Sequence, residues 1–263
     1  MRTLICSTDK RGVLTVCMNR PDVHNAFDAD MIRELTGALE AAGQDDAVRM
    51  VVITAKGSCF SAGADLNWMR SLVKASQDEN KRDALRLAEL MRKLNYLSKP
   101  TIARINGAAF GGGVGLIAAC DISIAVDNAL FGLTEARLGL VPAVISPYVI
   151  RCIGETHARR YFLSAERFDS QRAYDIGLVQ QTTGAEQLDE AVEDTIGHVL
   201  KGGPAAVSHG KHLVFEIAGH NEDSQKITDE HTASLIARLR VSREGQEGLT
   251  AFLEKRKPDW IND

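Results

Sequence analysis

The sequence predicts an α/β fold with parallel strands and a helical C-terminal third. Strand-like and helix-like segments alternate through about the first two-thirds of the chain, which is typical of parallel sheets covered by helices. Two of the strand-to-helix turns are rich in glycine, and helical patterns dominate after Pro147. No linker rich in proline or serine divides the chain. We therefore expect a core with the functional site over residues 1–200 and a helical packing or assembly region over residues 201–263, packed against each other.

The first elements alternate between strand and helix. Residues 12–21 alternate in polarity and end at a proline, which predicts a strand. Asp28 is a candidate N-cap for an amphipathic helix that ends at Gly43. Residues 49–55 are largely apolar, as expected for a buried strand.

The later elements follow the same order and then become helical. A long helix is predicted over residues 79–97, before a proline, and a strand over residues 101–105. Residues 121–142 predict two short strands and a bend, and residues 177–181 a further short strand. Residues 204–263 are rich in charges and predict helices.

The composition argues against nucleic-acid-binding and membrane proteins. The chain has 263 residues, 44% hydrophobic residues and a net charge of −4, which favours neither nucleic acid nor membrane as a partner. We expect no signal peptide and no membrane span. The five cysteines are scattered and form no C-x-x-C pair, so we expect a cytoplasmic protein. His209 and His212 stand three residues apart without a carboxylate pattern, which favours a surface pair over a metal site.

The stretch "INGAAFGGGVGLIAACD", Ile105–Asp121, places three glycines between a strand and a helix. Glycine permits close approach to the backbone, and N–H groups at a helix start have no intrahelical partner. Such a turn suits an anion or a developing oxyanion, although a tight packing turn is the structural alternative. Residues 113–118 also fit the G-x-G-x-x-A pattern of dinucleotide folds, but they begin too far beyond the strand for that role.

A second turn of the same kind follows the strand at residues 49–55. There Ala62, Gly63 and Ala64 precede another helix and offer a further backbone N–H. Two N–H donors that converge on one oxygen form an oxyanion hole, which polarises a carbonyl as charge develops on it. The two turns together therefore predict chemistry at a carbonyl group.

These stretches carry a resemblance to a known family. "FSAGADL", "GAAFGGGVGLIAACDISIA" and "FGLTEARLGLVP" resemble the three core motifs of the crotonase family, the enoyl-CoA hydratases and isomerases, and "MNRPDVHNAF" and "AFLEKRKPDW" also resemble that family. The resemblance implies a crotonase-type spiral of β-β-α turns with a C-terminal helical trimerisation region. It further implies a homotrimer or dimer of trimers, an acyl-CoA thioester substrate, and no cofactor beyond the coenzyme A of the substrate.

The resemblance also assigns catalytic residues. The oxyanion-hole donors would be the N–H groups of Ala64 and Gly112. Of the two glutamates in a family hydratase, the second falls on Glu135, which would transfer the proton, and the first falls on Gly115. A solvated or helix-terminal carboxylate is the alternative for Glu135. The missing side chain of Gly115 is expected to leave room for a larger acyl group or for the substrate's own carboxylate.

Further residues are candidates for substrate binding. They are Lys56, Ala62, Asp65, Leu66, Asn67, Trp68, Gly115 and Lys255. Trp68, with Met69 and Leu72, would line the acyl pocket or form an ordinary helix face. Lys56, Arg20 and, from a neighbouring subunit, Lys255 would bind the CoA phosphates, the alternative being solvated surface charges.

The resemblance extends to a reaction and a substrate class. "SAGADLNWM" together with "GLVPAVISPYV" resembles bacterial hydratases of 3-methylglutaconyl-CoA and isohexenylglutaconyl-CoA, from leucine and acyclic terpene breakdown. A hydratase with one glutamate needs other groups to hold water, and Ser146 and Tyr148 are candidates or else a helix cap and a core residue. An enoyl-CoA isomerase with a single glutamate and a non-catalytic binding scaffold are the alternatives.

Overall fold

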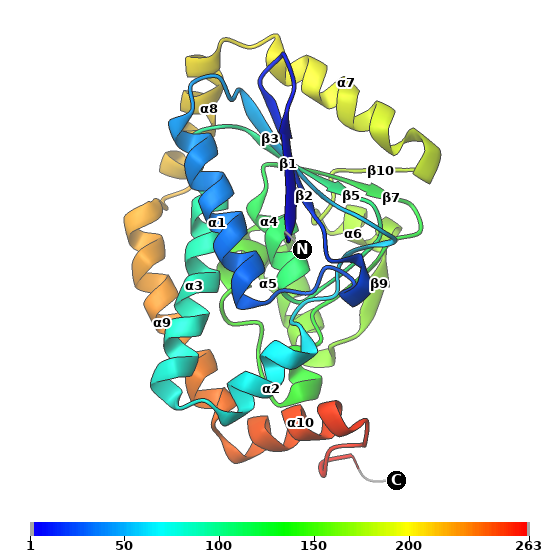
Figure 1. Ribbon diagram of the computed structural model, residues 1–263, viewed down its shortest axis with the longest axis vertical. Helices are drawn as coiled ribbons and strands as arrows, with labels where there is room; N and C mark the ends of the chain where they lie inside the picture. Colours follow the sequence, from blue (N-terminus) through cyan, green and yellow to red (C-terminus); the bar gives the residue numbers. More distant parts are fainter. Residues whose placement is uncertain (1–2, 262–263) are drawn as a thin grey trace.

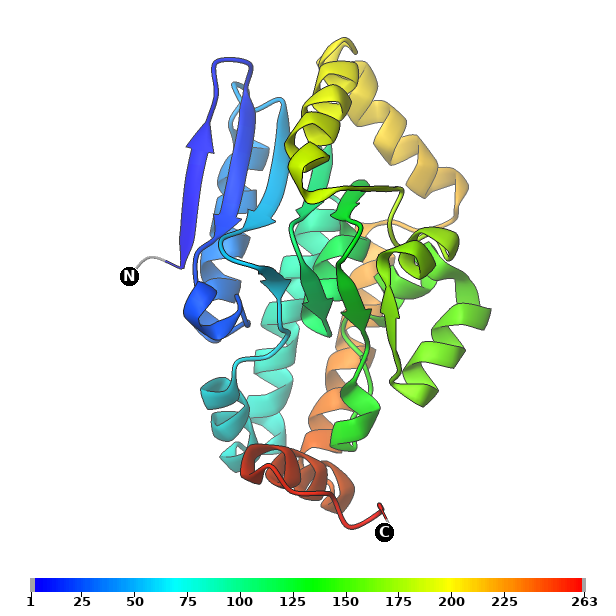
Figure 2. The same ribbon diagram turned by 90° about the vertical axis from the view of Figure 1, so that its right-hand side faces the viewer.

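The computed structural model describes residues 3–261, which form two mainly parallel sheets and a set of covering helices (Figures 1 and 2). The larger sheet has the order β1-β2-β3-β5-β7-β10 and the smaller one the order β4-β6-β8-β9. Only the β1–β2 and β8–β9 pairs are antiparallel among these strands. The α/β fold with parallel strands is therefore confirmed.

The strands are short. Those of the larger sheet are β1 (Leu4–Thr8), β2 (Val13–Met18), β3 (Met50–Ala55), β5 (Thr101–Ile105), β7 (Ile122–Val126) and β10 (Gln181–Thr183). Those of the smaller sheet are β4 (Cys59–Ser61), β6 (Ala108–Phe110), β8 (Leu130–Gly132) and β9 (Arg167–Asp169).

The helices cover the sheets and form the C-terminal third. They are α1 (Ala29–Gln44), α2 (Leu66–Lys74), α3 (Gln77–Asn95), α4 (Gly112–Ala119), α5 (Ser146–Ser164), α6 (Ser170–Asp175), α7 (Leu188–Leu200), α8 (Pro204–Ile217), α9 (Glu222–Arg240) and α10 (Arg243–Glu254). Three short 3₁₀ helices are η1 (Pro21–Val23), η2 (Glu135–Leu138) and η3 (Ala185–Gln187).

A repeated strand-strand-helix unit builds the core. In the units β3-β4-α2, β5-β6-α4 and β7-β8-η2, the first strand joins the larger sheet, the second joins the smaller sheet, and a helix follows. This is the β-β-α spiral that the resemblance implied. It places the starts of α2, α4 and η2 beside one another, because the strands before them are neighbours in the smaller sheet.

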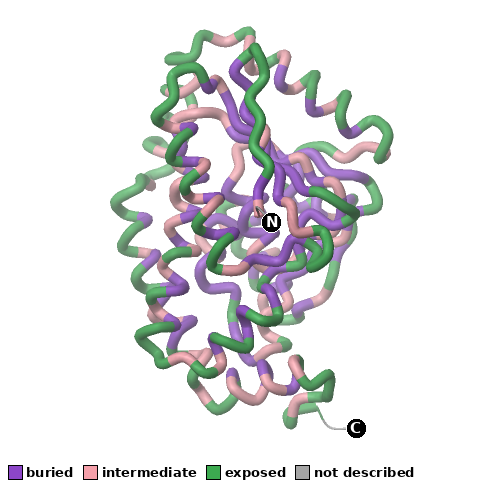
Figure 3. Tube along the Cα trace, in the orientation of Figure 1, coloured by how far each residue is buried: buried purple, intermediate pink, exposed green. Residues whose placement is uncertain are grey.

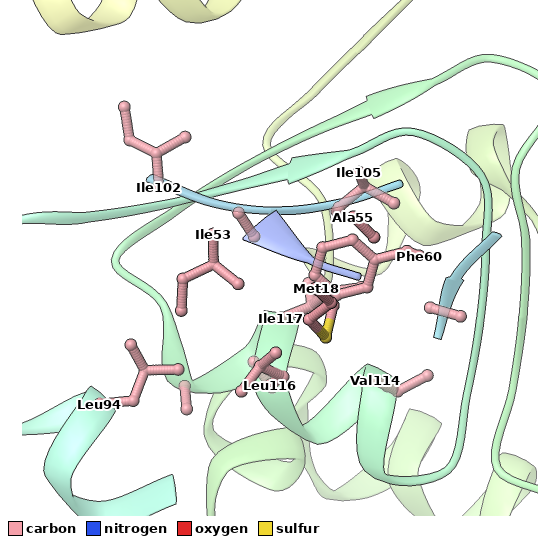
Figure 4. Packing of buried hydrophobic residues seen from close by; sticks show 14 of the residues in the cluster. Met18, Ile53, Ala55, Phe60, Leu94, Ile102, Ile105, Val114, Leu116 and Ile117 are labelled. Atoms are coloured by element: carbon pink, nitrogen blue, oxygen red, sulfur yellow. The ribbon is translucent and has the colours of Figure 1, made fainter. Parts of the chain in front are cut away.

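The core lies between the sheets and the helices (Figure 3). All residues of α4 after Gly112 are buried, and Figure 4 shows Val114, Leu116 and Ile117 of α4 in one cluster with Phe60. Burial of a Leu or Ile side chain contributes about 1.5–3 kcal/mol. The glycine-rich turn before α4 is therefore fixed by a helix that is anchored on all sides.

Most sequence-predicted elements are present, with shifted ends. Asp28 caps α1, since its carboxylate accepts a hydrogen bond from the Met31 N–H at 2.8 Å. The strand predicted at residues 177–181 is wrong in position, because β10 begins only at Gln181. Gly177 has a φ of +84°, and the N–H groups of residues 178 and 179 bond back to the end of α6, so this stretch is a turn.

Helix α10 closes one end of the molecule, while α9 runs along its side and α8 lies toward the opposite end (Figures 1 and 2). Helix α9 packs along α3, and α10 lies against α2 and η2. Within residues 3–261 no helix has the length and apolar character needed to cross a bilayer. The division of the chain at residues 200 and 201 stays a prediction.

Candidate active site

The two glycine-rich turns lie in direct contact. A β-carbon placed on Gly63 would lie 3.1 Å from the carbonyl oxygen of Phe110, and one on Gly113 would lie 2.9 Å from Cβ of Ser61. This contact follows from the parallel pairing of β4 with β6, since both turns leave the same edge of the smaller sheet. Glycine is required here because any side chain would separate the two turns.

Both turns offer a backbone N–H group. Gly112 is the first residue of α4, where an N–H has no acceptor within the helix. The Phe27 N–H donates to the Gly63 carbonyl at 2.6 Å, and the Asp65 N–H donates to the Phe27 carbonyl at 2.8 Å. In extended backbone the N–H groups of consecutive residues point to opposite sides. The N–H of Ala64, between these two bonded residues, therefore points away from Phe27. Ala64 and Gly112 line the same cavity, and their role as an oxyanion hole stays a prediction.

Glu135 lies over the glycine-rich turn. It begins η2, directly after β8, and a β-carbon on Gly111 would lie 3.1 Å from its Oε1 atom. Its Oε2 atom is shielded from solvent and accepts no hydrogen bond from residues 3–261. Burial raises the pKa of Glu135 to about 7. A carboxyl group with this pKa exchanges a proton readily near neutral pH.

A cavity of about 640 Å³ extends from Glu135 into an apolar region. Its walls come from the two turns, from Trp68, Met69 and Leu72 of α2, and from residues 140–145. The C-terminal helices of the same chain close it, with Ile236 on α9 and Leu249 on α10. The apolar walls suit a hydrocarbon chain.

The structure brings together part of the predicted site. Glu135, Ala64, Gly112, Ala62 and Trp68 line the cavity, as do Met69 and Leu72. Six predicted residues do not: Lys56, Asp65, Leu66, Asn67, Gly115 and Lys255.

The residues at the start of α2 have structural roles or face solvent. The Asp65 carboxylate caps α2 through the N–H groups of Asn67 and Trp68, and it pairs with Arg20 at 2.9 Å. Leu66 and Asn67 are exposed on the outer side of the helix. They do not line this cavity, because the helix turns them outward, and their role in substrate binding stays a prediction.

Gly115 does not leave open space. A β-carbon on Gly115 would lie 2.2 Å from Cγ2 of Ile145 and 3.5 Å from Cε of Met91, so these side chains fill the position. The expectation that Gly115 makes room for the acyl group is wrong. The residue instead allows the start of α5 to pack against α4, and Ile145 lines the cavity in its place.

The predicted phosphate-binding cations do not line the cavity, and their role stays a prediction. Lys56 and Lys255 are exposed and do not line the cavity, and Arg20 is engaged by Asp28 and Asp65. The cavity is instead lined by Arg137, Arg167, Arg240 and Arg256. Sequence reasoning missed these four arginines because they come from separate elements and share no local pattern.

The proposed water-positioning side chains are turned away as well. The Ser146 hydroxyl donates to the Ala143 carbonyl at 2.7 Å, and Tyr148 is a buried core residue. Neither lines the cavity. In residues 3–261 there is no cluster of His, Cys, Asp and Glu that fits a metal ion.

Known proteins resemble this chain over nearly its whole length. The profile of the family described as enoyl-CoA hydratase/isomerase matches residues 8–263. The 2,3-dehydroadipyl-CoA hydratase of Escherichia coli is 32% identical over 261 residues, 99% of this chain and 99% of that protein. The crotonyl-CoA hydratase of Syntrophomonas wolfei is 33% identical over 259 residues, 97% of this chain and 95% of that protein. A crystal structure of an enoyl-CoA hydratase from Shewanella pealeana has a TM-score of 0.79 and 44% identity, covering 98% of this chain and 96% of that one.

Proposed function

Because this chain belongs to the enoyl-CoA hydratase/isomerase family and is a hydratase, we propose that it adds water to a branched or dicarboxylic 2-enoyl-CoA. The observation that carries the proposal is Glu135, a carboxyl group with a pKa of about 7 beside two converging glycine-rich turns. It is the acid–base group that hydration of a conjugated thioester requires.

The proposed reaction proceeds through an enolate. The thioester oxygen accepts hydrogen bonds from the N–H groups of Ala64 and Gly112. Glu135 takes a proton from water while the water oxygen bonds to C3, and the electron pair of the double bond moves onto the thioester oxygen. The enolate then collapses, and C2 takes the proton from Glu135. One water molecule is added in all, and no cofactor is needed beyond the coenzyme A of the substrate.

Two observations support the substrate class. The motif pair around residues 61–69 and 139–149 resembles hydratases of 3-methylglutaconyl-CoA and isohexenylglutaconyl-CoA. The relative from Escherichia coli is named for 2,3-dehydroadipyl-CoA, which carries a second carboxyl group. Leucine or acyclic terpene breakdown in the cytoplasm is the setting that we propose.

We propose a homotrimer or dimer of trimers as the assembly. Exposed apolar side chains on one helix support this, because a surface of this kind gains from burial. They are Leu213, Val214 and Ile217 on α8, with exposed fractions of 55%, 65% and 79%. Sedimentation velocity of the full chain tests the assembly, and a monomer at micromolar concentration would contradict it.

A panel of enoyl-CoA thioesters tests the reaction. Crotonyl-CoA, 2-hexenoyl-CoA, 2,3-dehydroadipyl-CoA and 3-methylglutaconyl-CoA are each incubated with the protein, and the conjugated double bond is followed by absorbance. Product mass then identifies the chemistry. A gain of one water with the highest kcat/KM on a branched or dicarboxylic thioester supports the proposal. Altered conjugation without a mass change identifies an isomerase, and no turnover of any thioester favours a binding scaffold.

A further inference from the structure

The charged residues that line the cavity differ in their surroundings. They are Glu135, Arg137, Arg167, Arg240 and Arg256. Arg137, Arg167 and Arg256 are exposed to solvent, whereas the Arg240 side chain is only 12% exposed. Among the cavity residues that the structure describes, Arg240 is thus the one cation held inside.

Arg240 lies within the apolar part of the cavity. It is the last residue of α9, and its neighbours on the cavity wall include Ile236 and Leu249, members of a buried apolar cluster. The Gln246 side chain donates to the Arg240 carbonyl at 2.7 Å and to the Val73 carbonyl at 3.1 Å. This amide ties the ends of α9 and α2 together and fixes the backbone from which the guanidinium extends.

The guanidinium is only partly engaged by the protein. Its Nη1 atom lies 3.4 Å from Oδ1 of Asn80 and 3.5 Å from Oδ2 of Asp83, both at the long limit of hydrogen bonding. Within residues 3–261 only Nη1 of this guanidinium has an acceptor, and neither Nε nor Nη2 is fully shielded from solvent. Arginine offers five N–H donors in a planar fork, and the donors that residues 3–261 leave unpaired are open to solvent in the cavity. A ligand in the cavity could therefore accept hydrogen bonds from them.

Asp83 is the ion-pair partner of Arg240, at 3.5 Å from Nη1. The Trp68 indole N–H donates to the Asp83 carboxyl at 3.2 Å, which links the partly buried pair to the cavity wall. Burial raises the pKa of Asp83, although Arg240 opposes that effect. Because these contacts all involve Nη1, a second carboxylate could bind the Nε and Nη2 side of the fork.

We infer that Arg240 binds a carboxylate at the end of the acyl chain remote from the thioester. The planar fork of arginine matches a carboxylate through two parallel hydrogen bonds, which an apolar surrounding strengthens. The inference rests on the proposed function, because that function places the acyl chain in this cavity. It assigns the choice of a dicarboxylic over a monocarboxylic chain to one residue.

Saturated thioesters test the inference, because they bind without reacting. Isothermal titration calorimetry compares adipyl-CoA with hexanoyl-CoA and with adipamoyl-CoA, whose terminal amide has the same shape and no charge. The proteins are wild type, Arg240→Gln, Arg240→Gln with Asp83→Asn, and Arg238→Gln. The double variant avoids an unpaired Asp83 carboxylate. Arg238 lies on the same helix but is exposed and does not line the cavity.

Wild type and Arg238→Gln should bind adipyl-CoA about ten- to hundred-fold more tightly than either neutral thioester, as expected for hydrogen bonds to a charged group. Both Arg240 variants should lose that preference while their Kd for hexanoyl-CoA changes less than about threefold. Circular dichroism confirms folding. Absence of the preference in wild type, or its persistence in a folded Arg240 variant, would overturn the inference. The thioester panel tests the hydration reaction separately. If the protein hydrates thioesters but Arg240 has no effect on binding, this inference is refuted and the proposed function is not.

Discussion

Replacing Glu135 with glutamine should abolish turnover and at the same time stabilise the protein at alkaline pH. The amide keeps the shape of the side chain and removes the proton-transfer group, whose contribution is typically about 10²–10⁴-fold in rate. It also removes a carboxylate that has one oxygen shielded from solvent and without a partner.

The size and sign of the stability change follow from the pKa. Burial raises the pKa of Glu135 from 4.5 in the unfolded chain to about 7 in the folded one. Each pKa unit corresponds to about 1.4 kcal/mol, so ionisation of Glu135 costs the folded state at most about 3.5 kcal/mol. Below pH 4.5 both states hold the proton and there is no cost. The cost grows as the pH rises to about 7, where the folded protein also ionises, and is constant above that pH.

Urea unfolding at several pH values between about 5 and 8.5 measures this difference. The gap in unfolding free energy between Glu135→Gln and wild type should widen in favour of the variant up to about pH 7 and then level off. Glu186→Gln, at an exposed position, is the matched control and should show no such trend. A gap that does not change with pH would refute the prediction that burial raises the pKa of the Glu135 carboxyl group.

The activity of wild type provides the second test. If ionised Glu135 takes the proton from water, kcat/KM should fall as the pH decreases below about 7. Turnover close to the wild-type rate in purified Glu135→Gln would remove this residue from the mechanism.

Two further predictions concern the glycines of α4. Gly112→Pro should lose about 10²–10³-fold more in kcat than Gly112→Ala. Both substitutions place a β-carbon 2.8 Å from the Phe27 ring, but only proline removes the donor N–H. Equal losses would argue against the oxyanion hole. Gly115→Ala should lower the unfolding free energy by about 1–3 kcal/mol through its clash with Ile145, and Ile145→Ala should recover part of it in a double-mutant cycle. Additive losses would contradict the packing of Gly115 against Ile145.

Local patterns in the sequence were enough to predict much of the framework. Asp28 was identifiable as a cap because an N-cap side chain bonds to a backbone N–H only three residues away. The two glycine-rich turns were identifiable because strand, small residues and helix follow one another directly. Strands β4 and β6 were missed, since three-residue strands carry no periodicity and form only when neighbouring turns of the spiral pair.

The sequence by itself determined the α/β class, the two turns and the resemblance to a family, which made Glu135 the candidate acid–base residue. All of these depend on residues close together in the chain. Only the tertiary structure decided what surrounds Glu135. It filled the position beside Gly115 with Ile145, engaged Asp65 with Arg20, and brought Arg240 to the cavity. These outcomes depend on packing between helices distant in sequence, where side-chain volume and the direction of each helix face decide which residues meet.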